Sequence, residues 1–102
     1  MQQEEITLTS GEVLRMERRE FKSTSSHSIN IWTMDDPDII ATVGKEWRAV
    51  RGVPVWEPAV IRSHPIGTTV ETMPRLIEIL QHAARLAAEL DEQFVPGTEV
   101  TG

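Results

Sequence analysis

Three histidines and one acidic run are the residues of this chain that could bind a metal ion. His27, His64 and His82 lie far apart, and none has a second ligand at the spacing of a metal site. Three aspartates in the run 35–38 could join His27 or His64 around a divalent ion, but Asp-Asp-Pro-Asp is more typical of a turn. The sequence therefore predicts no metal site.

Serine and histidine, a possible nucleophile and base, are adjacent at positions 26–27 and 63–64. Neighbouring residues of a strand point to opposite faces, so adjacency alone does not make a catalytic pair. The chain also lacks a phosphate-binding glycine loop, a Gly-x-Ser-x-Gly elbow and a His-Glu-x-x-His helix. We therefore predict no catalytic residue and no cofactor, and the sequence favours a protein that is not an enzyme.

Three tryptophans and nearby basic residues form a candidate site for binding rather than for catalysis. If the alternating aliphatic residues of the predicted strands face a helix-covered core, the tryptophans fall on the opposite, exposed face. Exposed aromatic clusters are typical of interfaces. A bulge near Gly44 or Pro58 would instead turn the tryptophan side into the core, and this alternative stays open. The candidate binding residues are Trp32, Trp47, Trp56, Lys45, Arg48, Arg51 and Arg62.

A β-hairpin over residues 45–62 would position most of this site. Its two apolar segments are separated by Arg51 and Gly52, and two loop residues that include a glycine favour a tight turn. That loop pairs Trp47 with Trp56 at a non-hydrogen-bonded position. Pro54 then gives up only an outward-facing N–H, so the strand from residue 53 is predicted to be a sheet edge.

The remaining elements are strands followed by one long helix. The helix is predicted to start at Thr72, a favourable N-cap residue, with Pro74 in its first turn and no Gly or Pro before Pro96. Residues 12–22 also have the composition of a helix, but the loops around them favour a strand. The predicted strands outside the hairpin are 4–8, 12–22, 27–33, 39–43 and a short addition at 68–71.

The predicted helix has an apolar face wider than one sheet covers. Apolar residues fill roughly 200° of its circumference, whereas one sheet needs only about 100°. We therefore expect a second copy of the chain to cover the excess, so that the protein is a homodimer. The polar residues form one stripe, consisting of Arg75, Glu78, His82, Arg85 and Glu89.

Length and charge restrict the classes of protein and partner. A chain of 102 residues is expected to form one domain, here residues 1–94, followed by a disordered tail at 95–102. The chain has no cysteine, which excludes disulfides and thiol chemistry. Without a signal peptide or a membrane-spanning apolar run, we expect a cytoplasmic protein that does not interact with membranes. The formal net charge of −6 disfavours nucleic acid as a partner.

Two resemblances concern the helix and the order of elements. The Thr-capped, Ala/Leu-rich segment 72–90 resembles the C-terminal region of many small actinobacterial and actinophage proteins. Strands followed by one helix are also similar in order to the dimeric Whirly-type single-stranded-DNA binders, a likeness at the level of the fold alone.

The sequence thus predicts an α+β fold, with an antiparallel sheet of four to six strands packed by one long C-terminal helix. The predicted function is a non-enzymatic binding or adaptor module of bacterial or phage origin. A protein partner would bind through the tryptophan face, the helix or both. The alternative is a single-stranded nucleic-acid binder, in which the tryptophans stack on bases while Lys45, Arg48, Arg51 and Arg62 contact phosphates.

Overall fold

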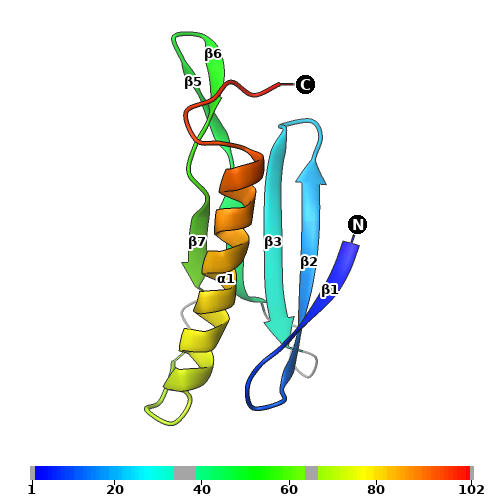
Figure 1. Cartoon of the computed structure of the whole chain (residues 1–102), viewed down its shortest axis with the longest axis vertical. Helices are drawn as coiled ribbons and strands as arrows, with labels where there is room; N and C mark the ends of the chain where they lie inside the picture. Colours follow the sequence, from blue (N-terminus) through cyan, green and yellow to red (C-terminus); the bar gives the residue numbers. More distant parts are fainter. Residues whose placement is uncertain (1, 34–38, 64–66, 102) are drawn as a thin grey trace.

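The computed structural model describes residues 2–33, 39–63 and 67–101, and it shows an antiparallel sheet with one long helix against it (Figure 1). The predicted α+β class is confirmed. The main sheet has five strands in the order β1-β2-β3-β4-β7, and a separate two-stranded sheet consists of β5 and β6. The elements are β1 (Gln2–Thr7), β2 (Val13–Phe21), β3 (Ser26–Thr33), β4 (Ile39–Lys45), β5 (Trp47–Val50), β6 (Val53–Trp56), β7 (Val60–Ser63) and α1 (Met73–Gln93).

The ambiguous segment 12–22 forms a strand because its side chains alternate between two environments. Leu14 and Met16 are buried on the helix side, whereas Val13 and Arg15, which alternate with them, are only partly buried on the other side. This period of two matches a sheet that has one covered face. Residues 68–71, in contrast, form coil and turn, so the short strand predicted there was wrong.

The core lies between the sheet and α1. Along β3 and β4, alternate side chains face the helix and are buried, including Ile29, Ile31, Ala41 and Val43. The helix contributes a narrower stripe than its apolar composition suggests, because only part of the apolar circumference meets the sheet. The buried helix residues are Ile79, Ala83, Leu86, Ala87 and Leu90.

Polar residues of α1 fix its rotation on the sheet. Arg75 donates to both carboxylate oxygens of Glu12, at 2.7 and 3.1 Å. The Glu78 carboxylate accepts from the backbone N–H of Thr9 at 2.7 Å and from its hydroxyl at 2.8 Å. Both partners belong to the loop between β1 and β2. The polar side of the helix therefore points toward β1 and β2.

The β5–β6 hairpin has the predicted register, with Trp47 opposite Trp56. Arg51 and Gly52 form its two-residue turn with φ values of 53° and 78°. Positive φ at both central positions is the pattern of a type I′ turn, whose twist matches that of a hairpin. This hairpin extends beyond the end of the main sheet (Figure 1).

The predicted strand 53–62 is interrupted in the structure. β6 ends at Trp56 and β7 begins at Val60, so that the two halves belong to different sheets. The interruption contains Pro58, which has no N–H to donate to a sheet ladder. Two backbone groups beside this proline are bonded by side chains instead. The carbonyl of Glu57 accepts from Lys45 Nζ at 2.5 Å, and the N–H of Ala59 donates to Asp91 Oδ1 at 2.9 Å.

Lys45 and Asp91 also form an ion pair that joins β4 to the end of the helix. Their Nζ and Oδ1 atoms are 2.6 Å apart, and the lysine side chain is fully buried. A buried ammonium is tolerated only where partners replace water, and Asp91 and the Glu57 carbonyl do so here. One pair of side chains therefore holds the break between β6 and β7 and attaches α1 to it.

The C-terminal segment lies along the outer edge of β6. Trp56 N–H donates to the Thr98 carbonyl, and Gly97 N–H donates to the Trp56 carbonyl, both at 2.9 Å. Val100 N–H donates to the Pro54 carbonyl at the same distance. The sequence predicts a disordered tail at 95–102, whereas residues 97–100 form a short extended segment whose backbone is hydrogen-bonded to β6. Pro54 fits this edge because its carbonyl accepts and its missing N–H is not needed.

We predict that Asp91→Ala lowers the free energy of unfolding by about 3 kcal/mol, because it leaves the buried Lys45 ammonium with a single carbonyl partner. Chemical denaturation measures this loss. Glu92→Ala, an exposed substitution at the next position, should change stability by less than about 0.5 kcal/mol. Equal effects of the two substitutions would contradict the role of the pair.

The same pair predicts a dependence of stability on acid pH. Burial raises the pKa of Asp91, but hydrogen bonds from Lys45 and the Ala59 N–H outweigh it and hold the pKa below its usual value. The stabilisation is therefore present above the usual aspartate pKa and is lost as the pH falls through the lowered value. Unfolding curves at decreasing pH should show a loss for the wild type that Asp91→Ala does not share.

Candidate binding cleft

A cleft of about 720 Å³ opens beside the helix near the hairpin that joins β2 to β3. α1 packs mainly on β4 and β7, and in Figure 1 it lies between β7 and β3. The helix-side face of β2 and β3 near their hairpin is therefore beside the helix rather than beneath it. The cleft volume falls within the range of ordinary ligand sites, about 300–1,000 Å³.

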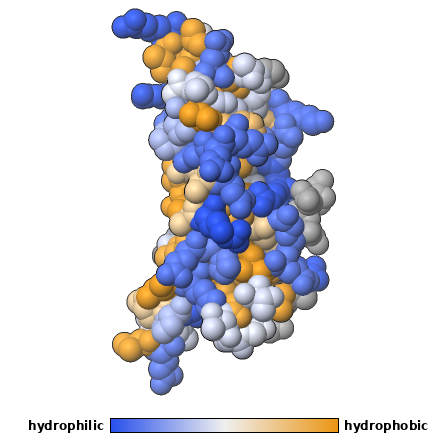
Figure 2. Space-filling model, in the orientation of Figure 1, coloured by the Kyte–Doolittle hydropathy of each residue, from blue (hydrophilic) through white to orange (hydrophobic). Residues whose placement is uncertain are grey.

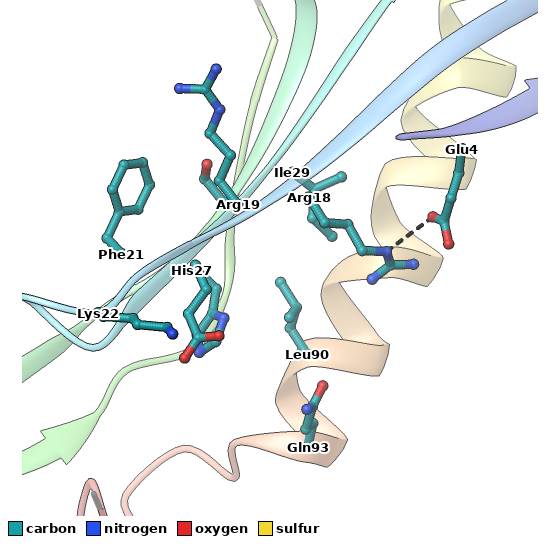
Figure 3. A pocket seen from close by; sticks show the side chains of 11 residues that line it. Glu4, Arg18, Arg19, Phe21, Lys22, His27, Ile29, Leu90 and Gln93 are labelled. Atoms are coloured by element: carbon teal, nitrogen blue, oxygen red, sulfur yellow. Dashed lines mark hydrogen bonds and ion pairs between the residues drawn. The ribbon is translucent and has the colours of Figure 1, made fainter. Parts of the chain in front are cut away.

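The cleft has an apolar floor. Ile29 of β3 and Leu90 of α1 both line it, and both are almost fully buried. Figure 3 shows Leu90 and Gln93 projecting from the helix toward the strands, with His27 across from them. Gln93 is exposed, so its amide stands at the rim of the cleft. An apolar side chain of a ligand would thus meet the floor, and polar groups would meet the rim.

His27 forms one wall and is held from behind by two aromatic rings. It stacks on Phe94 with ring centroids 4.3 Å apart, and Phe94 contacts the buried Trp56 at 4.8 Å. Burial lowers the pKa of His27 below the usual value of 6.5, although the charge of Glu20 acts in the opposite direction. The imidazole is therefore neutral at neutral pH and can donate one hydrogen bond and accept another.

Charged side chains of both signs surround the floor. Arg18 donates to Glu4 at 3.0 Å, the bond drawn in Figure 3, and lies 3.6 Å from a carboxylate oxygen of Glu89. Lys22 lies at the hairpin end near His27 (Figure 3), and Glu20 is directly opposite His27 in the β2–β3 register. Together with Arg19, the lining contains three cationic and two acidic side chains. Both arginines are already paired, Arg18 with Glu4 and Glu89 and Arg19 with Glu17, so among the described residues Lys22 is the lining cation without an ion pair.

Among the described residues, one edge of β2 has no partner strand beside the cleft. The pairing of β1 with β2 ends at Gln2 opposite Arg18, whereas β2 continues to Phe21. Residues 19–21 pair with β3 on one side, and within residues 2–33, 39–63 and 67–101 no strand pairs with them on the other. Their outward N–H and C=O groups form a short template for another extended chain.

The structure separates the three tryptophans. Trp32 lies opposite Arg15 on the sheet face away from the helix, as predicted. Trp47 is exposed on the hairpin, and its indole N–H donates to the Thr24 carbonyl. Trp56 is only 7% exposed and packs against His27 and Phe94, so the prediction that it is exposed was wrong. The interruption at Pro58 explains this position, in agreement with the alternative left open by the sequence.

The four predicted basic residues also do not converge. Lys45 is buried in its ion pair with Asp91, where it cannot contact a phosphate. Arg48 and Arg51 lie on the extending hairpin, and Arg62 lies on β7 opposite Thr42. The candidate site of seven residues is therefore not one surface, and a binding role for its exposed members stays a prediction.

Sequence reasoning missed the residues that build the cleft. His27 was considered only as an isolated metal ligand or base, and Asp91 and Phe94 were not considered. One signal was present: Lys45 has the same strand parity as Ala41 and Val43, which places a cation on the buried face of β4. A cation at such a position requires a buried partner, and the partner here is 46 residues away in sequence.

Some sequence predictions lie outside the described residues. His64 and the aspartates at 35, 36 and 38 belong to this group. In the part of the chain that the structure describes, no group of three or more His, Asp or Glu side chains could hold a metal ion. Among the described residues, no helix is long and apolar enough to span a membrane. Comparisons with family models, curated proteins and solved structures find no match to this chain.

We predict that stability falls as the pH is lowered below about 6.5, because the folded protein binds a proton at His27 less readily than the unfolded chain does. This part of the stability is present above the usual histidine pKa and is lost as the pH falls through the lowered value. His27→Phe keeps a ring on Phe94 and removes the titrating group. Unfolding at several pH values should therefore give a smaller slope below pH 6.5 for this variant. An unchanged slope would contradict the burial of a neutral His27.

Proposed function

We propose that the protein is a small non-enzymatic binding module whose cleft takes an extended segment of a partner protein. The observation that carries this proposal is the position of the cleft directly beside the open edge of β2. An extended peptide adds to a sheet edge through main-chain hydrogen bonds, and pockets for alternate side chains give specificity. In this protein the unpaired edge of β2 and the apolar floor of the cleft lie next to each other.

The lining of the cleft supports a particular kind of segment. Ile29 and Leu90 favour one apolar side chain that enters between the sheet and the helix. Lys22, the lining cation that has no ion pair among the described residues, favours an acidic ligand residue next to that apolar side chain. The proposed ligand is therefore a short extended peptide with an apolar residue and a neighbouring carboxylate.

A non-enzymatic binding module is also the class predicted from the sequence, but the proposed binding surface is the cleft rather than the tryptophan face. We also propose, as the sequence suggests, a homodimer in the cytoplasm of a bacterium or its phage. The single-stranded nucleic-acid alternative is not carried further. It requires tryptophans and cations on one face, and both Trp56 and Lys45 are buried.

A display library of random peptides tests the proposal. Gln93→Trp should fill the mouth of the cleft, because Gln93 stands exposed at its rim. Peptides enriched on the wild type should bind this variant at least about tenfold more weakly, a change of 1.4 kcal/mol. Glu92→Trp introduces the same indole at the neighbouring exposed position, which does not line the cleft, and should bind them as the wild type does.

The sequences of the enriched peptides give a second, independent outcome. The proposal predicts an apolar residue followed or preceded by Asp or Glu. A library that yields no enriched peptide, or peptides that bind both variants equally, would contradict the cleft as a peptide site.

A further inference from the structure

β7 is the last strand of the main sheet, and its outer edge is open. In the described part of the chain, β7 pairs with β4 alone. All four of its residues are exposed, including Val60 at 47% and Ile61 at 38%. Natural proteins protect such edges with charges, prolines or bulges, because an open edge recruits another strand. Within β7 itself the only charged residue is Arg62.

An exposed apolar stripe of α1 lies on the same side of the molecule. It consists of residues that share one flank of the helix, at spacings of three or four. The polar flank is bonded to Thr9 and Glu12 near β1 and β2, and Asp91 on the other flank contacts Ala59 just before β7. The α1 apolar stripe, which lies on this second flank, is Met73, Ile77, Leu80, Ala84 and Ala88; Leu80 is half-buried and the other four are exposed.

The edge and the stripe form one surface of low charge. Figure 2 shows apolar surface along the margin where β7 and α1 lie in Figure 1, whereas hydrophilic surface dominates the margin of β1 and β2. The stripe contains no charged residue. Two copies of a chain with net charge −6 repel each other, but the acidic residue that continues this stripe, Asp91, is already paired with Lys45.

We propose that a second copy of the chain covers this surface by antiparallel pairing of the two β7 strands. The proposal deepens the homodimer proposed above and is independent of the peptide cleft. A two-fold axis perpendicular to the sheet keeps both helices on one face and joins the two five-stranded sheets into one. The α1 apolar stripes of the two copies then line a shared groove above the paired β7 strands.

Strand parity and charge select the register of this pairing. Ile61 is opposite Val43, so it lies on the helix side, whereas Arg62 opposite Thr42 lies on the other side. Pairing Ile61 with Ile61 of the second copy places two apolar side chains beneath the helices. It also places Arg62 opposite Val60 of the second copy. A shift that pairs Arg62 with itself would bring two like charges together, which is destabilising.

Disulfide formation by a single introduced cysteine tests this register, because the chain has no cysteine of its own. Directly opposed residues in antiparallel strands have Cα atoms about 4.5–5.5 Å apart, within the range that a disulfide spans. Ile61→Cys should therefore form a disulfide-linked dimer under mild oxidation. Ser63→Cys should not, since position 63 is then opposite position 59. Val70→Cys, at a residue 92% exposed, controls for random collision.

The oligomeric state supplies the second measurement. Size-exclusion chromatography with light scattering should give a dimer for the wild type and a monomer for Ile77→Glu, which places a carboxylate in the α1 apolar stripe. Arg85→Glu, a charge change at another exposed helix position, should leave the dimer intact. Unchanged circular dichroism shows that each variant is folded.

Three results would overturn the proposal. These are a monomeric wild type, a dimer that survives Ile77→Glu, and an Ile61→Cys variant that cross-links no more than Val70→Cys. The cleft lies toward the opposite edge of the sheet from β7. Peptide binding by a monomeric protein would therefore support the proposed function and contradict only this interface.

Discussion

A fully buried lysine, Lys45, determines how several segments of this molecule are positioned relative to one another. The Lys45 ammonium has lost its water, so it needs acceptors within the protein, and it finds the Asp91 carboxylate and the Glu57 carbonyl. Asp91 in turn accepts from the Ala59 N–H. These bonds connect the end of β4, the break between β6 and β7, and the last turn of α1. Arg18 also links three segments, β1, β2 and α1, but its side chain is partly exposed, whereas that of Lys45 is fully buried.

The candidate cleft follows from that connection. Because Asp91 attaches the end of α1 above the break, the next helix residues bring Phe94 onto His27 and Trp56. The chain then continues along β6, where its backbone pairs with Trp56. The helix end is thus held near β4 and the hairpin, and β2 is left uncovered beside it. A structural ion pair on one side of the helix therefore leaves the candidate cleft open on the other side.

Local sequence signals predicted the local parts of this fold. Arg51 and Gly52 predicted the turn and hence the Trp47–Trp56 register, because a two-residue loop leaves no other pairing. Thr72 and Pro74 predicted the start of the helix to within one residue. Alternation predicted the strand at 27–33 and the position of Trp32, and the flanking loops predicted the strand at 12–22.

Apart from the strand predicted at 68–71, the differences depend on contacts between distant residues. The interruption after Trp56 exists because Lys45 and Asp91 satisfy the backbone on either side of Pro58, and periodicity in a short window carries no information about Asp91. Trp56 is buried because that interruption turns the hairpin toward Phe94. The segment 97–100 pairs with β6 because the helix end delivers it there. One missed ion pair therefore accounts for each of these differences.

Amide hydrogen exchange in Lys45→Met tests this dependence most directly. Methionine fills a similar volume and removes the charge, so the sheet can remain packed. If the lysine holds the hairpin and the C-terminal segment, the amides of Trp56, Glu57 and Gly97 should lose protection, while those of Ile29 and Ile31 keep theirs. Unchanged protection at Trp56 and Gly97, or an equal loss at all five amides, would contradict it.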